Sequence, residues 1–190
     1  MTWNLIRLSE APASPWRNGG GVTHELAAGP AREDWAWRIS VAEVAADGPF
    51  SDFAGVQRWF AVVRGAGVRL AIDGQVHEVV AASAPLEFDG AAKVDSWLLS
   101  GPTQDLNLMV QRARATGRMT RLAGTQRFTP AADGVLAVYA LDAGASLQTS
   151  ADAAPFELPP HTLAWATLAA GTEVDVTSPG ALCMEITPGA

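Results

Sequence analysis

Cysteine is nearly absent from this chain of 190 residues, in which Cys183 is the only one. A single cysteine excludes an internal disulfide framework and fits a reducing compartment. Cys183 lies in an apolar stretch, where a free thiol commonly behaves as a small buried hydrophobe. We therefore interpret it as a core residue rather than as a nucleophile.

Long apolar runs are missing too, since none approaches the roughly 20 residues that a membrane helix needs. The first residues lack the basic segment followed by an apolar one that marks a secretory signal. Basic charge is scarce, with 13 Lys and Arg against 20 Asp and Glu and a net charge of −7. This balance argues against nucleic acid and anionic membranes as partners. We expect a cytoplasmic protein.

The motifs of metal sites and of common hydrolases are also lacking. A metal site needs clustered His, Cys, Asp or Glu, but His24, His77 and His161 are far apart in the sequence and form no His-x-His pair. There is no Gly-x-Ser-x-Gly elbow. Neither Lys-Ser/Thr nor a helical pattern follows glycines 19–21, which excludes a phosphate loop. The sequence predicts no metal and no cofactor.

Helical periodicity is not convincing over any ten residues, which argues against parallel βαβ folds. Short strand patterns separated by turn signals are present instead. In residues 35–42, Trp37 and its alternate neighbours face one way, while Arg38 and its alternate neighbours face the other. Asp73-Gly74 is a strong hairpin signal between two such strands. The predicted fold class is all-β.

The two halves of the chain look related. Four residues of the first half recur after about 75 residues: Gly67 as Gly144, Leu70 as Leu147, Pro85 as Pro160, and Met109 as Met184. This period suggests two copies of one small β barrel or sandwich. We expect the first over residues 1–115 and the second over residues 125–190. Residues 116–124 lie in an arginine-rich stretch and are the expected linker.

The segment at residues 16–25 stands out because it contains three consecutive glycines, 19–21. Glycines are costly to order, so they indicate positive φ angles or close backbone approach. Trp16, Arg17 and Asn18 precede them, and a strand pattern follows. We interpret the segment as a loop that presents polar groups at one end of a β structure. A tight hairpin without a ligand is the alternative.

Polar residues occupy one face of several otherwise apolar strands. Arg38 and Ser40 have small neighbours, and Arg58 opens an apolar strand. A further strand carries four such residues on one face: Asp105, Asn107, Met109 and Gln111. Since arginine binds carboxylates bidentately, a barrel interior lined in this way would suit a small organic anion. Alternatively, the two arginines face solvent or pair with Glu25 and Asp105.

Four motifs resemble the HutD/Ves family in order and spacing, over roughly residues 3–187. They are WRNGGGVTHE at 16–25, WRIS at 37–40, GPFSDFAG at 48–55 and DLNLM at 105–109. The resemblance implies two tandem cupin-type barrels (RmlC-like jelly rolls) in one bacterial chain, the second barrel being degenerate. It also implies a homodimer, since cupins pair through strands. Many members have proline where this chain has Ala54, a departure that affects loop stiffness alone.

The family's association with histidine utilisation implies a function. The expected protein is a metal-free regulator or accessory factor that binds a small carboxylate such as formylglutamate or urocanate. We place the pocket in the first barrel. Arg38 and Arg58 would hold carboxylates. Neutral hydrogen bonds would come from Ser40, Asn107, Asn18 and Thr23. The walls would be Trp16, Phe50, Phe53 and Met109.

Two other functions stay open at this point. An isomerase or hydrolase acting on the same acids needs a general acid or base in the pocket. Strand alternation puts Glu25 on the face of Thr23 and His24 on the core face, so Glu25 alone would suit. The other alternative is a stress-response interaction protein that pairs through an exposed sheet face.

Overall fold

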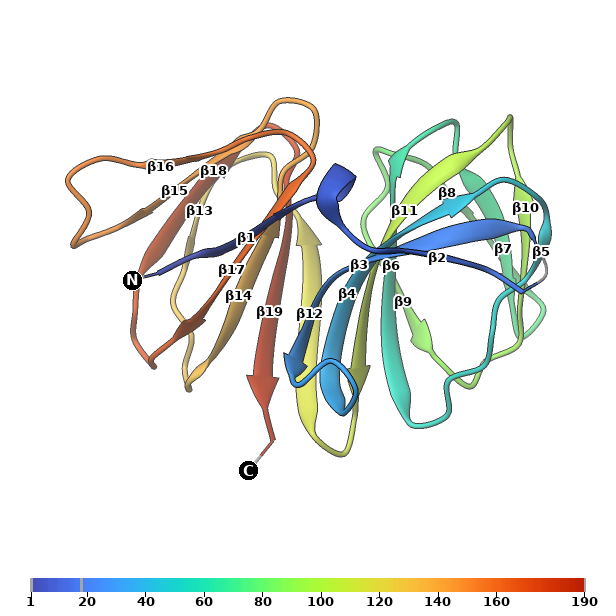
Figure 1. The fold of residues 1–190 in the computed structure, drawn as a ribbon, viewed down its shortest axis with the longest axis horizontal. Helices are drawn as coiled ribbons and strands as arrows, with labels where there is room; N and C mark the ends of the chain where they lie inside the picture. Colours follow the sequence, from blue (N-terminus) through green and yellow to red (C-terminus); the bar gives the residue numbers. More distant parts are fainter. Residues whose placement is uncertain (1, 18, 190) are drawn as a thin grey trace. The chain divides into compact units, whose positions relative to one another are not determined.

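The computed structural model describes residues 2–17 and 19–189, which form antiparallel sheets and one 3₁₀ turn, η1 (Leu8–Glu10) (Figure 1). The chain divides into two compact units. We call Ala11–Ala115 the first barrel, and Met1–Glu10 together with Thr116–Ala190 the second barrel. No helix in the described residues has the length and apolar character needed to cross a membrane.

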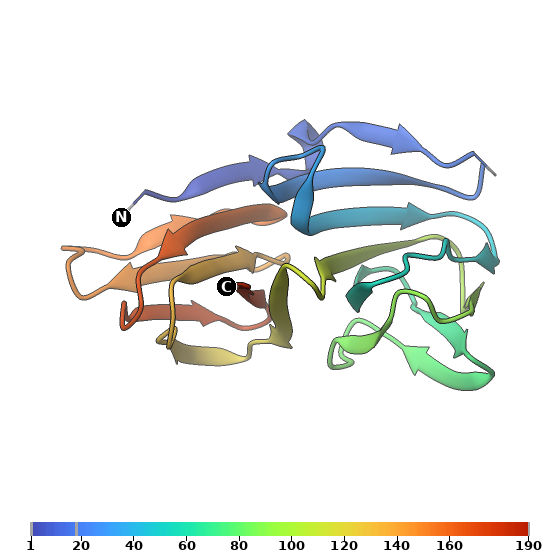
Figure 2. The same ribbon diagram turned by 90° about the horizontal axis from the view of Figure 1, so that it is seen from below.

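The first barrel consists of a six-stranded sheet, β2-β3-β4-β11-β6-β9, and a four-stranded sheet, β5-β10-β7-β8. Strands β3, β4 and β11 run side by side (Figure 2). The bounds are β2 (Ala13–Pro15), β3 (Gly21–Pro30), β4 (Trp35–Val44), β5 (Gly48–Pro49), β6 (Val56–Arg64), β7 (Val68–Ile72), β8 (Gln75–Val79), β9 (Leu86–Asp89), β10 (Val94–Leu98) and β11 (Thr103–Gln111). The predicted Asp73-Gly74 turn joins β7 to β8 with positive φ at both residues.

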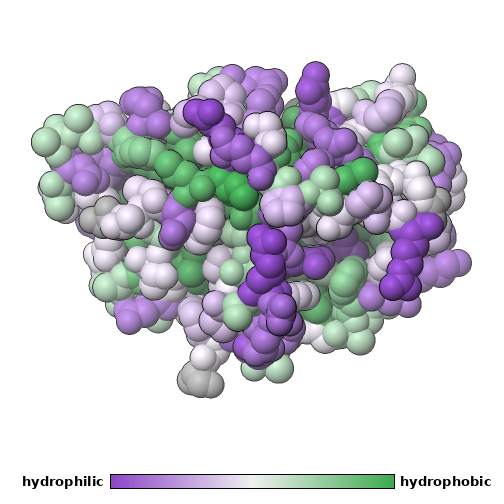
Figure 3. All heavy atoms as spheres, in the orientation of Figure 1, coloured by the Kyte–Doolittle hydropathy of each residue, from purple (hydrophilic) through white to green (hydrophobic). Residues whose placement is uncertain are grey.

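The second barrel has the sheets β1-β17-β14-β19-β12 and β13-β18-β15-β16. Its strands are β1 (Asn4–Arg7), β12 (Ala115–Arg121), β13 (Gly124–Phe128), β14 (Gly134–Tyr139), β15 (Ala145–Thr149), β16 (Phe156–Leu158), β17 (Thr162–Leu168), β18 (Val174–Ser178) and β19 (Leu182–Pro188). Hydrophobic atoms gather in the region of the edge strand β1 in Figure 3, and Leu5 on this strand is 49% exposed.

The pairing of strands confirms the predicted repeat. Strands β4 to β11 pair with one another in the same order as β12 to β19. Gly67 and Gly144 precede equivalent strands with φ of 113° and 73°. A Cβ on Gly67 would lie 2.5 Å from the Val79 carbonyl oxygen, and one on Gly144 would lie 2.9 Å from that of Leu158. Both sites need glycine because a positive φ coincides with a close backbone contact.

Two expected boundaries differ from the structure. The first ten residues group with the second barrel, because β1 pairs with β17. The expected linker at 116–124 is mostly strand, since β12 runs to Arg121 and β13 begins at Gly124. Its arginine-rich composition suggested a solvated linker. On β12, however, Met119 is buried and Arg118 is exposed, so the charge of Arg118 lies on the outer face of a strand.

The interiors of the two barrels differ in polarity. Buried apolar side chains such as Phe128, Leu147 and Val176 fill the second barrel. Cys183 belongs to this cluster as predicted, and burial raises its pKa to about 12, so its thiol stays protonated. In the first barrel an apolar cluster around Phe60 and Leu70 lies beside buried polar residues on β4, β6 and β11. The first barrel therefore has buried polar groups that can contact a ligand.

Candidate functional site

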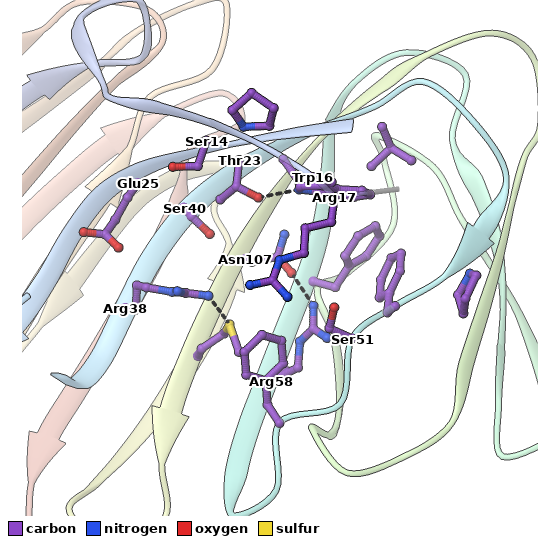
Figure 4. A pocket seen from close by; sticks show the side chains of 18 residues that line it. Ser14, Trp16, Arg17, Thr23, Glu25, Arg38, Ser40, Ser51, Arg58 and Asn107 are labelled. Carbon is purple, nitrogen blue, oxygen red and sulfur yellow. Dashed lines mark hydrogen bonds between the residues drawn. The ribbon is translucent and has the colours of Figure 1, made fainter. Parts of the chain in front are cut away.

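The first barrel contains a cavity of about 650 Å³, lined from β3, β4, β6 and β11, from the β2–β3 hairpin and from the loop around residues 49–53 (Figure 4). Nine of the ten predicted binding residues line it: Trp16, Thr23, Arg38, Ser40, Phe50, Phe53, Arg58, Asn107 and Met109. The tenth, Asn18, lies outside the described residues. The structure thus brings together residues from four separate sequence motifs.

Strand register explains how they meet. Met109 on β11 is paired with Arg38 on β4 and Arg58 on β6. Two residues along β11, Asn107 is paired with Ser40 and Phe60. Because paired residues share a face and alternate residues repeat it, two rows of side chains project into the barrel together.

Arg58 is the more buried of the two arginines, with 7% of its surface exposed. Its Nη2 donates a hydrogen bond to Asn107 Oδ1 at 3.0 Å. The rings of Phe50, Phe53 and Phe88 lie 5.0–5.6 Å from the guanidinium carbon. Burial, and after it the charge of Arg38, lowers the Arg58 pKa to about 10. Even so, Arg58 is a full cation at neutral pH.

Arg38 is held by uncharged neighbours as well. Its Nη2 donates to Met109 Sδ at 3.2 Å, and its guanidinium carbon lies 5.3 Å from the Trp35 ring and 5.8 Å from the Phe53 ring. Burial lowers its pKa, and the charge of Glu25 opposes that shift. The Nε atoms of both Arg38 and Arg58 are buried without a hydrogen-bond partner in the described residues.

Neither arginine forms an ion pair within residues 2–17 and 19–189, so the alternative in which they pair with Glu25 and Asp105 is wrong. Glu25 Oε1 instead lies 2.8 Å from Arg32 Nε, in an ion pair not aligned as a hydrogen bond. Asp105 is fully buried and accepts a hydrogen bond from Thr103 Oγ1 at 2.9 Å. Arg38 and Arg58 therefore have no counter-ion among the described residues.

The β2–β3 hairpin forms another wall of the cavity. Trp16 Nε1 donates to Thr23 Oγ1 at 2.8 Å, and the Trp16 backbone N–H donates to the Gly21 carbonyl at 2.9 Å. Gly19 has a φ of 71°. At Gly21 a Cβ would lie 2.4 Å from the Glu43 carbonyl oxygen and 3.1 Å from the Trp16 ring. The glycine run therefore serves close backbone approach and holds Trp16 over the cavity.

We expect Gly21→Ala to lower the free energy of unfolding by about 1–3 kcal/mol, because the added methyl group has no room beside the Glu43 carbonyl. Gly48→Ala is the matched control, since a Cβ there meets nothing within 4 Å. Urea unfolding of both variants measures the difference. Equal stabilities would contradict the steric requirement at Gly21.

Four polar residues line the cavity but are absent from the predicted binding set, namely Ser14, Arg17, Glu25 and Ser51. Arg17 is exposed and adjoins Trp16. Its position in the 16–25 motif is the sequence feature that could have predicted it as a lining residue. Glu25 is the one carboxylate among the described lining residues, and strand alternation predicted its face correctly. His24 does not line the cavity and lies 3.3 Å from Glu43 Oε1. The described residues contain no group of three potential metal ligands.

Comparison with known proteins gives consistent matches. A family model described as HutD matches residues 8–184. An uncharacterized 21.2 kDa protein from the hutC 3′ region of Pseudomonas putida is 37% identical over 134 residues, 70% of each chain. Protein Ves of Citrobacter koseri is 33% identical over 114 residues, 59% of this chain and 60% of that one.

Solved structures agree with these matches. HutD from Pseudomonas fluorescens SBW25 has a TM-score of 0.85 and 30% identity, with both chains covered completely. A cupin 2 conserved barrel domain protein from Leptotrichia buccalis has a TM-score of 0.57 and 13% identity, covering 98% of this chain and 96% of that one. The second likeness concerns the fold alone.

Proposed function

The chain belongs to the HutD family, and from this premise we propose that its first barrel binds a small carboxylate and that the protein acts as a regulator or accessory factor in histidine utilisation. The carrying observation is that Arg38 and Arg58 converge on one cavity without a protein counter-ion in the described residues. Buried charges in proteins are ordinarily paired. A ligand carboxylate supplies the missing negative charge and fits the planar donor fork of a guanidinium.

Two relatives support this choice of ligand. The Pseudomonas putida relative belongs to the hutC 3′ region, and the Pseudomonas fluorescens HutD structure was obtained in a formate condition. Formate is the smallest carboxylate. We propose formylglutamate and urocanate as candidate ligands, with Asn107, Ser40 and Thr23 as neutral hydrogen-bonding partners in the cavity.

Binding is favoured over catalysis by the state of Glu25. A general base needs an available carboxylate within reach of the substrate, whereas the Glu25 carboxylate already contacts Arg32 at 2.8 Å. NMR of each acid incubated with the protein should therefore show unchanged ligand. Conversion of either acid would favour an enzyme instead.

Calorimetric titration with formate, formylglutamate and urocanate tests the proposal. We expect binding to the unmodified protein and a loss of about tenfold or more in affinity for Arg38→Ala, because charge-assisted hydrogen bonds are lost. Arg69→Ala is the control, since Arg69 lies on β7, is 53% exposed and faces Glu78 at 3.7 Å. If none of the acids binds at millimolar concentration, the assignment fails. If Arg38→Ala and Arg69→Ala bind alike, Arg38 is not a ligand-binding residue.

A further inference from the structure

We propose that the natural ligand carries two acidic groups and that Arg17, on the β2–β3 hairpin, binds the second of them. The inference rests on the proposed function, in which Arg38 and Arg58 hold the first group. It adds a residue outside the predicted binding set and narrows the ligand to a dicarboxylate.

The charges lining the cavity do not balance with a single carboxylate. Arg17, Arg38 and Arg58 all line it, and Figure 4 shows the Arg17 side chain reaching into the cavity toward Asn107. The lining carboxylate, Glu25, already lies 2.8 Å from Arg32. With Glu25 set aside, a ligand with one negative charge leaves two of these three cations in excess, whereas a dicarboxylate leaves one. The second carboxylate therefore halves the unbalanced charge, and like charges at close range repel each other.

Arg38 and Arg58 are held by hydrogen bonds to the protein, whereas Arg17 is exposed. This difference fits a ligand that is bound at two separate acidic groups. Arg58 and Arg38 are fixed by Asn107 at 3.0 Å and by Met109 at 3.2 Å. Arg17 is exposed on a turn, two residues before Gly19, whose φ is 71°. Its side chain forms no hydrogen bond or ion pair with the described part of the chain. It is therefore available to meet the outer end of a ligand whose inner end is fixed.

The size of the cavity agrees with a ligand of this length. Pockets of about 300–1,000 Å³ hold whole small-molecule ligands, and this one measures about 650 Å³. A one-carbon acid would fill a small part of it. The rings of Phe50 and Phe53 lie along it and can contact a short methylene chain. Of the two candidate ligands, formylglutamate has two carboxylates and urocanate has one, so the inference favours the former class.

The test compares glutarate with its monoamide, glutaramate, which has the same length and one carboxylate fewer. Calorimetry would use the unmodified protein, Arg17→Gln, and Arg69→Gln as the control that removes an equal charge on the outer face of β7. We expect glutarate to bind about tenfold or more tightly than glutaramate to the unmodified protein and to Arg69→Gln. In Arg17→Gln this ratio should fall to about two or less.

Other outcomes separate this inference from the proposed function. If both acids bind the unmodified protein with equal affinity, the second carboxylate is not recognised and the inference fails, while the first site stands. If the ratio is unchanged in Arg17→Gln, Arg17 is not the residue responsible. If neither acid nor formate binds at millimolar concentration, the proposed function fails together with the inference.

Discussion

Arg58→Met is expected to abolish carboxylate binding and, in the same protein, to raise the free energy of unfolding. Truncating one partner of a buried, hydrogen-bonded charge pair costs about 2–5 kcal/mol of binding, so affinity should fall roughly 30-fold or more. Without ligand, Arg58 is a buried cation whose pKa burial lowers from 12.5 to about 10. That shift corresponds to about 3 kcal/mol against the charged form.

Methionine has a similar length and no charge, so it removes this penalty. Arg58→Met also loses the hydrogen bond to Asn107 and the contacts with the aromatic rings, which destabilises the variant by about 2 kcal/mol. The net gain in stability should be about 1 kcal/mol. Below about pH 10 Arg58 is charged in both the folded and the unfolded chain, so the cost of burying its charge does not change with pH there. The gain in stability should therefore be equal at pH 6 and pH 8.

Urea unfolding and calorimetry of the same preparations measure both effects. Arg58→Lys is the matched control, because it keeps the charge and loses the planar fork. It should bind better than Arg58→Met and gain no stability. Loss of stability in Arg58→Met with binding unchanged would show that Arg58 is a structural residue rather than the anchor of an anion site.

Asp105→Asn is expected to stabilise the protein by about 2–4 kcal/mol at pH 8 and by less than about 1 kcal/mol at pH 4. Asp105 is fully buried, and its Oδ1 has no partner in the described residues. Burial raises its pKa from 3.8 to about 7, although the hydrogen bond from Thr103 acts in the opposite direction. Asparagine has the same size, can accept that bond and carries no charge.

The pH dependence follows from the direction of the Asp105 shift. Between about pH 4 and pH 7 the folded chain keeps a proton that the unfolded chain has lost, so stability falls as the pH rises through this window and is level above it. A difference of about 3 between the two pKa values corresponds to an upper limit of about 4 kcal/mol. Asp105→Asn should flatten this part of the curve.

Urea unfolding at several pH values measures this effect. Asp95→Asn, at a partly exposed position on β10 opposite Ala71, should change stability by less than about 0.5 kcal/mol. An equal gain for Asp105→Asn at pH 4 and pH 8 would contradict a buried carboxyl that titrates between them.

The cavity lining was largely predictable because strands impose a period of two residues. Once residues 35–42 were identified as a strand, Arg38 and Ser40 had to share one face. The same rule placed Asn107 with Met109 and excluded His24 from the face of Glu25. Arg17 was not predicted, because it lies on a turn, where no strand period determines the direction of a side chain.

The boundaries of the two barrels were predicted less well for a related reason. Strand β1 pairs with β17, so that Leu5 lies opposite Ala164. The four residues of β1 are too few to show an alternation of apolar and polar residues that would predict so distant a partner. In the second barrel, Arg127 pairs with Asp175 at 2.8 Å across neighbouring strands. Asp175 is far from Arg127 in the sequence, so this ion pair could not be predicted from neighbouring residues. Without it, the arginine-rich stretch resembled a solvated linker.

By itself, the sequence determined the all-β class, the repeat of two barrels and the faces of the long strands, because alternation and turn residues act over a few neighbouring positions. Tertiary structure alone decided that Arg38 and Arg58 have no counter-ion in the described residues and that Glu25 contacts Arg32 instead. Whether a charge is paired depends on distances of 3–4 Å between strands that are remote in the sequence. Those distances exist only once the register of β4, β6 and β11 is fixed.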